Sequence, residues 1–455
     1  MTKTVLPGLL ACACCAMLLA LFSPLTYAQI LVAVLALLCA LWWVTEPIPV
    51  PATSLLPLAL LPLFGVLTPS QVAQAYGHPL ILLLMAGCML SKAMERSDTH
   101  LHLAVQMLHL FGSGSARRVV WGFMAASAVL SMWVSNTATT LMLLPVALAV
   151  IRSSENPSMA LPLLLGIGYA ASIGGMGTPI GTPPNLILMS VYEQTFGRSI
   201  SFAQWMAWGL PVVIVLLPLA AWWLTRNVGE AGAFSLPEKQ SWTIEQRRVL
   251  WVFLATALAW ISRTEPWGGW QAWLGLPGAN DASVAMVAVI VMFAIPNGRG
   301  GRLLDWDSAV RIPWSMLLLF SGGIALAKGF VESGLADQLA ELIASLSVLP
   351  TLVMIVCVCL FVTFMTEVTS NTASTSLLMP VLAAAAVAAQ VEPLLLMLPA
   401  ALSASCAFML PVATAPNAII YGSAMVPIKD MVRFGIALNL LGVLVIAVVS
   451  YVALA

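Results

Sequence analysis

The chain has 455 residues, of which 61% are hydrophobic and only 8% are charged. Soluble globular domains carry about 25% charged residues, so this composition excludes a soluble protein and predicts one that crosses a membrane repeatedly. The 18 basic and 18 acidic residues give a formal net charge of zero, which indicates no nucleic-acid partner. The sequence contains no HExxH, no G-x-S-x-G and no nucleotide-binding loop, so an intramembrane hydrolase is a remote alternative.

The long apolar runs are rich in Leu and Ala and show no alternation, which predicts spanning helices and excludes a β-barrel. At about 20 residues per crossing, they allow an all-α polytopic fold with about 11 transmembrane helices. The first run, residues 9–22, follows Lys3 and precedes "LTYA", and so resembles a secretory signal peptide. Because a second apolar run, residues 30–44, follows immediately, we expect a retained first helix.

A polar segment divides the chain into two halves. We expect residues 1–225 to form a first repeat, residues 226–247 a polar connecting loop and residues 248–455 a second repeat. A shift of 235 positions places Ser-Asn-Thr-Ala at 135–138 on the same four residues at 370–373. Further matches keep nearly the same spacing: Gly87 pairs with Gly323, Lys92 with Lys328 and Asn185 with Asn417. Three signatures in one order indicate an internal duplication.

The duplicated triplets Ser135-Asn136-Thr137 and Ser370-Asn371-Thr372 interrupt apolar runs. Ser and Asn bond to the backbone and favour helix ends over helix interiors. We therefore expect broken helices at 135–137 and 370–372, whose free amides attract an anion and whose oxygens bind cations. The alternative reading of one triplet is ordinary hydrogen bonding between helices. Two triplets in register favour the binding site.

A second pair of interruptions follows the triplets. Residues 172–185, "SIGGMGTPIGTPPN", hold four glycines and three prolines, and residues 410–418, "LPVATAPNA", are their counterpart. No membrane helix survives such a composition, so we expect an unwound loop surrounded by protein or by a water-filled cavity. Short segments around Lys92 and Lys328 suggest re-entrant hairpins near residues 79–96 and 314–332, with both lysines reaching towards the membrane surface.

Few ionisable residues accompany these motifs. Glu367 lies four residues before Asn371, whereas its counterpart in the first repeat is Met132. The four histidines, at positions 78, 100, 102 and 109, lie away from the paired motifs in the sequence. Proton relays usually run through intramembrane carboxylates or histidines, so the neutral oxygens favour Na⁺ over H⁺ as a coupling ion. Nothing in the sequence indicates an organic cofactor.

Several motifs in one order resemble the divalent-anion/sodium symporter family, solute carrier family 13 in animals. They include "WWVTEPIPVPATSLLPLALLPLFGV", "SMWVSNTATTLMLLPVAL", "SIGGMGTPIGTPPN" and "TEVTSNTASTSLLMPV", and the resemblance spans residues 42–435. It implies a homodimer of two inverted repeats per protomer, with a scaffold domain and an elevator-type transport domain. It also implies a multi-pass protein of a bacterial inner membrane that carries C4 dicarboxylates such as succinate, malate and fumarate, or sometimes a tricarboxylate.

The resemblance also implies the residues of three binding sites. The first sodium site would consist of Ser131, Ser135, Asn136 and the backbone at Gly181, and the second of Thr366, Ser370, Asn371 and the backbone at Ala413. The dianionic substrate would contact Asn136, Thr137, Thr182, Asn371, Thr372 and Thr414. Some family members exchange dicarboxylates without sodium, so symport and sodium-independent exchange both stay open at this point.

Overall fold

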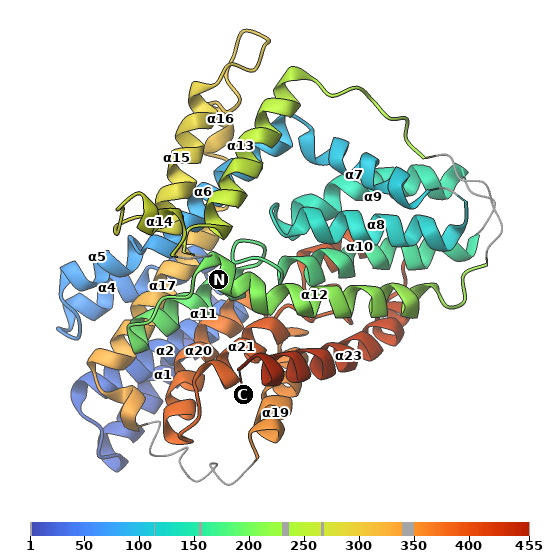
Figure 1. The fold of residues 1–455 in the computed structure, drawn as a ribbon. Helices are drawn as coiled ribbons and strands as arrows, with labels where there is room; N and C mark the ends of the chain where they lie inside the picture. Colours follow the sequence, from blue (N-terminus) through green and yellow to red (C-terminus); the bar gives the residue numbers. More distant parts are fainter. Residues whose placement is uncertain are drawn as a thin grey trace.

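The computed structural model describes residues 2–112, 114–153, 157–229, 236–264, 268–338 and 350–454. All regular secondary structure in these residues is helical, apart from one β-bridge between Pro296 and Arg302. Figure 1 shows the chain as a bundle of helices from end to end. The all-α fold class is therefore confirmed for the part of the chain that the structure describes.

The helices follow one another closely along the chain. The first half contains α1 (Thr2–Phe22), α2 (Tyr27–Thr45), α3 (Val50–Thr53), α4 (Leu56–Leu63), α5 (Pro69–Tyr76), α6 (Pro79–Arg96), α7 (Thr99–Phe111), α8 (Ala116–Ser131), α9 (Asn136–Ser153), the 3₁₀ turn η1 (Pro157–Met159), α10 (Ala160–Gly175), α11 (Pro183–Phe196) and α12 (Phe202–Thr225). The second half contains α13 (Ile244–Ile261), α14 (Gly269–Trp273), α15 (Asp281–Ala294), α16 (Trp306–Ala309), α17 (Trp314–Glu332), α19 (Thr351–Thr366), α20 (Asn371–Ala388), α21 (Leu394–Ser403), α22 (Ala415–Gly422) and α23 (Ile428–Leu454).

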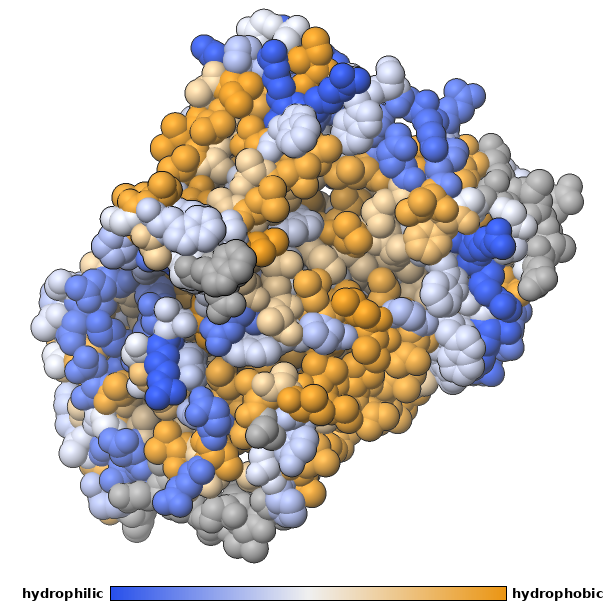
Figure 2. All heavy atoms as spheres, viewed as in Figure 1, coloured by the Kyte–Doolittle hydropathy of each residue, from blue (hydrophilic) through white to orange (hydrophobic). Residues whose placement is uncertain are grey.

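Six stretches of the described chain are long and apolar enough to cross a membrane. They are Pro69–Arg96, Asn136–Ser153, Phe202–Thr225, Trp314–Glu332, Asn371–Ala388 and Ile428–Leu454. Shorter apolar helices, including Tyr27–Trp43 and Ala160–Gly175, accompany them. The surface in Figure 2 is broadly apolar through its middle and polar towards the upper and right-hand ends. These features define a polytopic membrane protein, and the count of about 11 crossings stays a prediction.

The helices form two groups that matter for the site. We call α8–α12 and α19–α23 the hairpin bundle, because the two sets pack against each other through α12 and α23, α9 and α22, and α11 and α20. We call α2–α6, α13, α15 and α17 the frame helices, in which α6 packs against α15 and α17 packs against α2, α4 and α5. The groups meet where α17 contacts α11 and α20, and also where α2 contacts α20, α6 contacts α11 and α13 contacts α12. α1 lies against α2.

The prediction of re-entrant hairpins near residues 79–96 and 314–332 is wrong. Each range is one unbroken helix, α6 and α17 respectively. Gly87 and Gly323 lie inside these helices and allow neighbouring side chains to pack closely. A Cβ on Gly87 would lie 3.5 Å from Ile180, and one on Gly323 would lie 3.1 Å from Ser376. A glycine inside a helix allows a neighbouring element to approach closely without bending the chain.

A hairpin occurs instead at the first Ser-Asn-Thr triplet. α8 ends at Ser131 and α9 begins at Asn136. α8 runs in the same direction as α10, since Met124 lies against Gly166 and Met132, just after α8, lies against Gly177, just after α10. α9 returns along α10, and Figure 1 shows α8 and α9 side by side. The segment 135–137, predicted as a break within one helix, is therefore the end of a hairpin turn.

The corresponding second interruption separates α19, which ends at Thr366, from α20, which begins at Asn371. The glycine- and proline-rich segments also leave the helical state. α10 ends at Gly175 and α11 starts at Pro183, while α21 ends at Ser403 and α22 starts at Ala415. Four interruptions thus lie at equivalent positions of the two halves.

The tight contact between α8 and α10 gives a test of this packing. A Cβ on Gly174 would overlap the backbone of Ala128, and overpacking of this kind costs about 1–3 kcal/mol. We expect Gly174→Ala to lower the apparent melting temperature of the purified protein in detergent. Gly422→Ala is the matched control, because a Cβ there meets nothing within 4 Å. Equal melting temperatures for both variants would contradict the close approach of α8 and α10.

Candidate functional site

One cavity of about 1070 Å³ contains the interruptions of both halves. From the first half it is lined by Ser135, Asn136, Thr137, Gly181 and Thr182, and from the second half by Ser370, Asn371, Thr372, Ala413 and Thr414. Each residue of the first set lies about 235 positions before its counterpart in the second set, which is the shift that relates the two halves. The fold therefore brings ten of the twelve predicted site residues to one cavity wall. The other two, Ser131 and Thr366, are fully buried behind that wall.

The first turn gathers oxygen atoms around Asn136. The Ser131 hydroxyl oxygen lies 2.5 Å from one end of the Asn136 side-chain amide, and this end also lies 3.2 Å from the Gly181 carbonyl oxygen and 3.3 Å from that of Ala171. The backbone carbonyl of Asn136 accepts a hydrogen bond from Thr140 Oγ1 at 2.8 Å. Ala171 was not predicted from the sequence, because it lies in a regular stretch of α10 and contributes only its backbone.

The second turn repeats this arrangement with Thr366 in place of Ser131. Thr366 Oγ1 lies 2.5 Å from Asn371 Oδ1 and 3.2 Å from the carbonyl oxygen of Ala404. The Asn371 carbonyl accepts from Thr375 Oγ1 at 2.7 Å. Both turns therefore use a hydroxyl five residues before the asparagine and another four residues after it.

The two unwound loops are braced by a matching pair of asparagines. Asn185 Nδ2 donates to the carbonyls of Gly175 at 3.0 Å and Thr178 at 2.7 Å. Asn417 Nδ2 donates to the carbonyls of Ala407 at 2.9 Å and Leu410 at 3.0 Å. Each amide satisfies carbonyls that have no helical partner, as backbone away from water requires. The sequence matched these asparagines but did not reveal this role.

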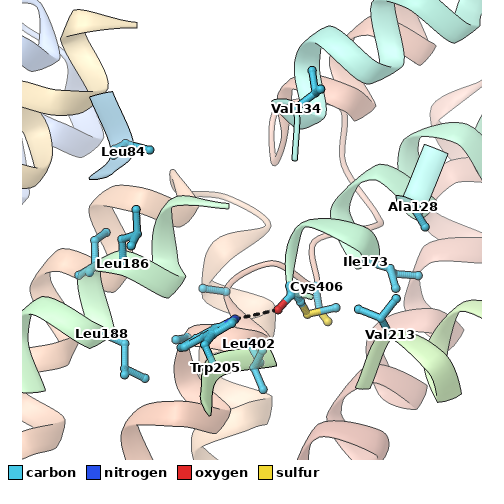
Figure 3. Packing of buried hydrophobic residues seen from close by; sticks show 14 of the residues in the cluster. Leu84, Ala128, Val134, Ile173, Leu186, Leu188, Trp205, Val213, Leu402 and Cys406 are labelled. Atoms are coloured by element: carbon cyan, nitrogen blue, oxygen red, sulfur yellow. Dashed lines mark hydrogen bonds between the residues drawn. The ribbon is translucent and has the colours of Figure 1, made fainter. Parts of the chain in front are cut away.

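The supports beneath the loops differ between the halves. In the first half, Trp205 Nε1 donates to the Met176 carbonyl at 3.0 Å, the contact drawn with a dashed line in Figure 3. In the second half, the buried Glu367 accepts from the backbone amides of Met409 at 2.9 Å and Leu410 at 3.0 Å, and from Asn439 Nδ2 at 2.7 Å. Glu367 thus holds the second loop from below and does not line the cavity.

The cavity is also lined by titratable side chains, which we call the charged wall: Glu46, Lys92, Glu95, Asp98, His100 and Arg311. Lys92 Nζ forms an ion pair with Glu95 Oε2 at 2.5 Å. Sequence reasoning missed this wall, since its members come from the end of α2, from α6, from the α6–α7 junction and α7, and from the segment before α17. Only the spacing of Lys92 and Glu95, three positions apart on a helix, signalled the ion pair in advance.

The donors at the two turns are hydroxyl, amide and carbonyl oxygens. Such oxygens suit hard cations, whereas transition metals prefer imidazole or thiolate ligands. Within the part of the chain that the structure describes, no three His, Cys, Asp or Glu residues lie close enough together to hold a metal ion. The site can therefore bind a hard cation and, through the amides and hydroxyls at the helix starts, an anion beside it.

Interrupted helices from two halves that meet in one cavity define a membrane transporter. Comparison with known proteins identifies the family. A profile of the citrate transporter (CitMHS) family matches residues 40–401. The sodium-dependent dicarboxylate transporter SdcS of Staphylococcus saprophyticus is 40% identical over 460 residues, which is 95% of this chain and 88% of that protein. SdcS of Staphylococcus aureus strain RF122 is 40% identical over 94% of this chain and 86% of its own length.

The chain therefore belongs to the divalent-anion/sodium symporter family, and it is a transporter rather than an enzyme. Two solved structures share the fold at low sequence identity. The YdaH transporter of Alcanivorax borkumensis matches with a TM-score of 0.60 and 16% identity, over 94% of this chain and 98% of that chain. MtrF of Neisseria gonorrhoeae matches with a TM-score of 0.60 and 14% identity, over 94% and 95%.

Substitution of Glu367 tests how the second loop is held. In Glu367→Gln, one side-chain oxygen is replaced by the NH₂ group of a carboxamide. This group cannot accept from the N–H donors that face it, so a buried hydrogen bond is lost at a cost of about 1–3 kcal/mol. We expect a lower melting temperature in detergent. Glu332→Gln is the matched control, because Glu332 is exposed and bonds only to Gln71 among the contacts described. A melting temperature equal to the control would show that Glu367 does not hold the loop.

Proposed function

We propose that this protein is a sodium-coupled symporter of C4 dicarboxylates, of the succinate, malate and fumarate type, in a bacterial inner membrane. The observation that carries the proposal is the single cavity in which both Ser-Asn-Thr turns and both unwound loops meet. Relatives that are 40% identical over most of their length are named sodium-dependent dicarboxylate transporters, which supports the same coupling ion and substrate class here.

The first cation site is proposed to consist of Ser131, Ser135, Asn136 and the Gly181 carbonyl. The polar groups gathered around Asn136 support it. The Ser131 hydroxyl oxygen and the carbonyl oxygens of Gly181 and Ala171 lie 2.5, 3.2 and 3.3 Å from one end of the Asn136 side-chain amide. Oxygens of this kind suit a hard cation.

The second cation site is proposed to consist of Thr366, Ser370, Asn371 and the Ala413 carbonyl. Its support is the repeated geometry: the hydroxyl of Thr366 meets Asn371 Oδ1 at the same distance as Ser131 meets Asn136 Oδ1. Ala413 lines the cavity beside this turn. Two sites of neutral oxygens bind monovalent cations without holding a fixed negative charge that would repel a dianion.

The dicarboxylate is proposed to bind between the two turns, in contact with Asn136, Thr137, Thr182, Asn371, Thr372 and Thr414. The hydroxyls that begin the helices around the cavity are used unequally. Thr414 accepts a capping bond from the Asn417 amide, whereas neither Thr182 nor Ser370 makes a capping bond to its own helix. The Thr182 hydroxyl, and the amides in the first turn of α20, are suited to the substrate carboxylates, whereas Ser370 belongs to the second cation site.

Charge neutralisation is the physical reason for coupling. The two basic side chains that line the cavity are Lys92, which is paired with Glu95, and Arg311. Neither lies on the turns or loops that hold the proposed substrate site. Bound sodium ions would supply the positive field there, so that the dianion binds well only after the cations. This order of binding links the two fluxes.

Transport is proposed to follow an elevator mechanism between two inverted repeats, within residues 1–225 and 248–455. The hairpin bundle would be the transport domain and the frame helices the scaffold that holds a homodimer together. In support, the bundle contains all four interruptions. Its contacts with the frame include α11 and α20 against α17, α20 against α2 and α12 against α13. Each net positive charge that enters would gain about 2.3 kcal/mol per 100 mV, or roughly fiftyfold accumulation.

Uptake into proteoliposomes tests the function directly. We expect labelled succinate to accumulate inside only when an inward Na⁺ gradient is present, because the cations complete the anion site. K⁺ in place of Na⁺ is the control. Uptake that requires internal dicarboxylate and ignores Na⁺ would instead establish exchange, and absence of uptake for every C4 dicarboxylate would refute the proposal.

The site assignment has its own test. We expect Asn136→Ala and Asn371→Ala each to reduce sodium-dependent succinate uptake to background, because each removes an oxygen from a cation site and a group from the substrate site. Asn280→Ser is a matched control: Asn280 is exposed at the start of α15, and serine also caps helices well. Size-exclusion profiles establish that the variants are folded. Normal uptake by either alanine variant would remove that asparagine from the site.

A further inference from the structure

A cluster of aromatic side chains surrounds Trp133 at the end of the first hairpin. Trp133 lies between α8 and α9, two residues before Ser135. Its ring is parallel to that of Phe202, with centroids 6.1 Å apart, and to that of Trp260, at 6.5 Å. Phe253 meets it edge-on at 5.4 Å and 84°. The turn that carries the first proposed cation site is thus in contact with side chains of α12 and α13.

The aromatic pocket that receives Trp133 is itself firmly held. Phe202 and Trp260 are buried and stack at 4.6 Å. Trp260 Nε1 donates to the Asp281 carbonyl at 2.9 Å. The Asp281 carboxylate accepts from the Phe202 amide at 3.2 Å and from Arg263 Nε at 2.6 Å. Asp281 therefore links the start of α12 and the end of α13 to the start of α15, through its ion pair with Arg263 and its hydrogen bonds with Phe202 and Trp260.

The second turn has no tryptophan at this position. Val368, 235 positions after Trp133, is 66% exposed. The next residue, Thr369, forms local hydrogen bonds, to the Met365 carbonyl at 2.7 Å and to Ser374 Oγ at 2.6 Å. At this position the second turn is held by polar contacts within its own hairpin, and Glu367 ties the same turn to Met409, Leu410 and Asn439. Only the first turn is held by an aromatic side chain packed against a neighbouring helix pair.

We propose that Trp133 is a positioning residue for the first cation site, an inference that rests on the sodium sites proposed above. In the turn itself, the amides of Trp133 and Val134 both bond to the Leu130 carbonyl, and the Thr178 hydroxyl donates to the Met132 carbonyl. Stacking of the indole against α12 and α13 restricts the turn to one orientation. Ser135 and Asn136 then face the cation without an ordering cost at the moment of binding.

Hydrogen–deuterium exchange of the protein in nanodiscs tests the positioning without any transport assay. We expect Trp133→Ala to raise exchange in a peptide spanning residues 130–140 by about tenfold, because the aromatic contacts that order the turn are lost. A peptide spanning residues 365–376 should not change. Trp133→Phe, which keeps an aromatic ring, should lie close to wild type. Trp251→Ala is the matched control, since Trp251 is on α13 but 72% exposed.

Sodium activation tests the consequence for binding. We expect Trp133→Ala to raise the Na⁺ concentration for half-maximal succinate uptake by about tenfold, with rescue by Trp133→Phe and no change in Trp251→Ala. The KM for succinate at saturating Na⁺ should stay within about twofold of wild type. A general folding defect would instead lower the maximal rate and leave the sodium dependence unchanged, and that result would overturn the proposal.

Phe253→Ala is the second variant, to be used if Trp133→Ala does not fold. It removes the edge contact to Trp133 from the α13 side and leaves the hairpin sequence intact. We therefore expect faster exchange at residues 130–140 and a higher Na⁺ requirement, both smaller than in Trp133→Ala. The exchange result separates the two proposals. If wild-type uptake does not depend on sodium, the proposed function fails, while faster exchange at residues 130–140 still supports anchoring by Trp133. Unchanged exchange in Phe253→Ala and Trp133→Ala would overturn the anchoring itself.

Discussion

Backbone groups that leave the helical state inside a membrane protein must find other partners, and this requirement organises the whole site. The chain interrupts its helices four times around one cavity. Lipid cannot satisfy the released amides and carbonyls at such positions. Asn185, Asn417, Trp205 and Glu367 satisfy those that face the protein. Those that face the cavity are the groups that we propose for ligand binding, so the same feature is both a structural cost and the proposed binding site.

The two halves share this chemistry but not its support. The hydroxyl of Ser131 lies as far from Asn136 Oδ1 as the hydroxyl of Thr366 lies from Asn371 Oδ1. The groups that would touch ligands are therefore nearly equivalent in the two halves. Beneath them, the first half relies on indole side chains and the second on a buried carboxylate with an amide. A duplicated chain needs identical atoms only where an ion or substrate touches it. Away from these atoms, the two halves fill space and pair their polar groups with different side chains.

The distribution of charge around the cavity agrees with a transporter of small ions. The cavity-lining residues of the turns and loops carry neutral oxygens and amides, whereas the titratable groups that line the cavity belong to the charged wall, on other segments of the chain. Neutral groups bind ions reversibly, because no fixed charge has to be neutralised when the ligand leaves. Family membership, established over most of the chain, and the fold shared with two other transporters agree with this arrangement.

Composition and internal repetition determined the class of protein, since an apolar chain with duplicated polar triplets leaves few alternatives to a two-halved membrane transporter. The triplets and loops also identified most of the cavity-lining residues, because local propensity alone requires Ser, Asn, Gly and Pro to leave a helix there. The path of the chain between them depended on tertiary packing. Gly87 and Gly323 looked like turn residues but lie inside straight helices, as a glycine that accommodates a neighbour has the same sequence signal as one that turns the chain.

Long-range partners were equally invisible in the sequence. Glu367 could be read as a proton carrier until its contacts with Met409, Leu410 and Asn439 showed a structural role. Trp133 looked like one apolar residue among many until the fold brought it to Phe202 and Trp260. Local sequence determines where helices must stop, because backbone preferences act over a few residues. Only the assembled helices decide which distant side chains hold those ends in place.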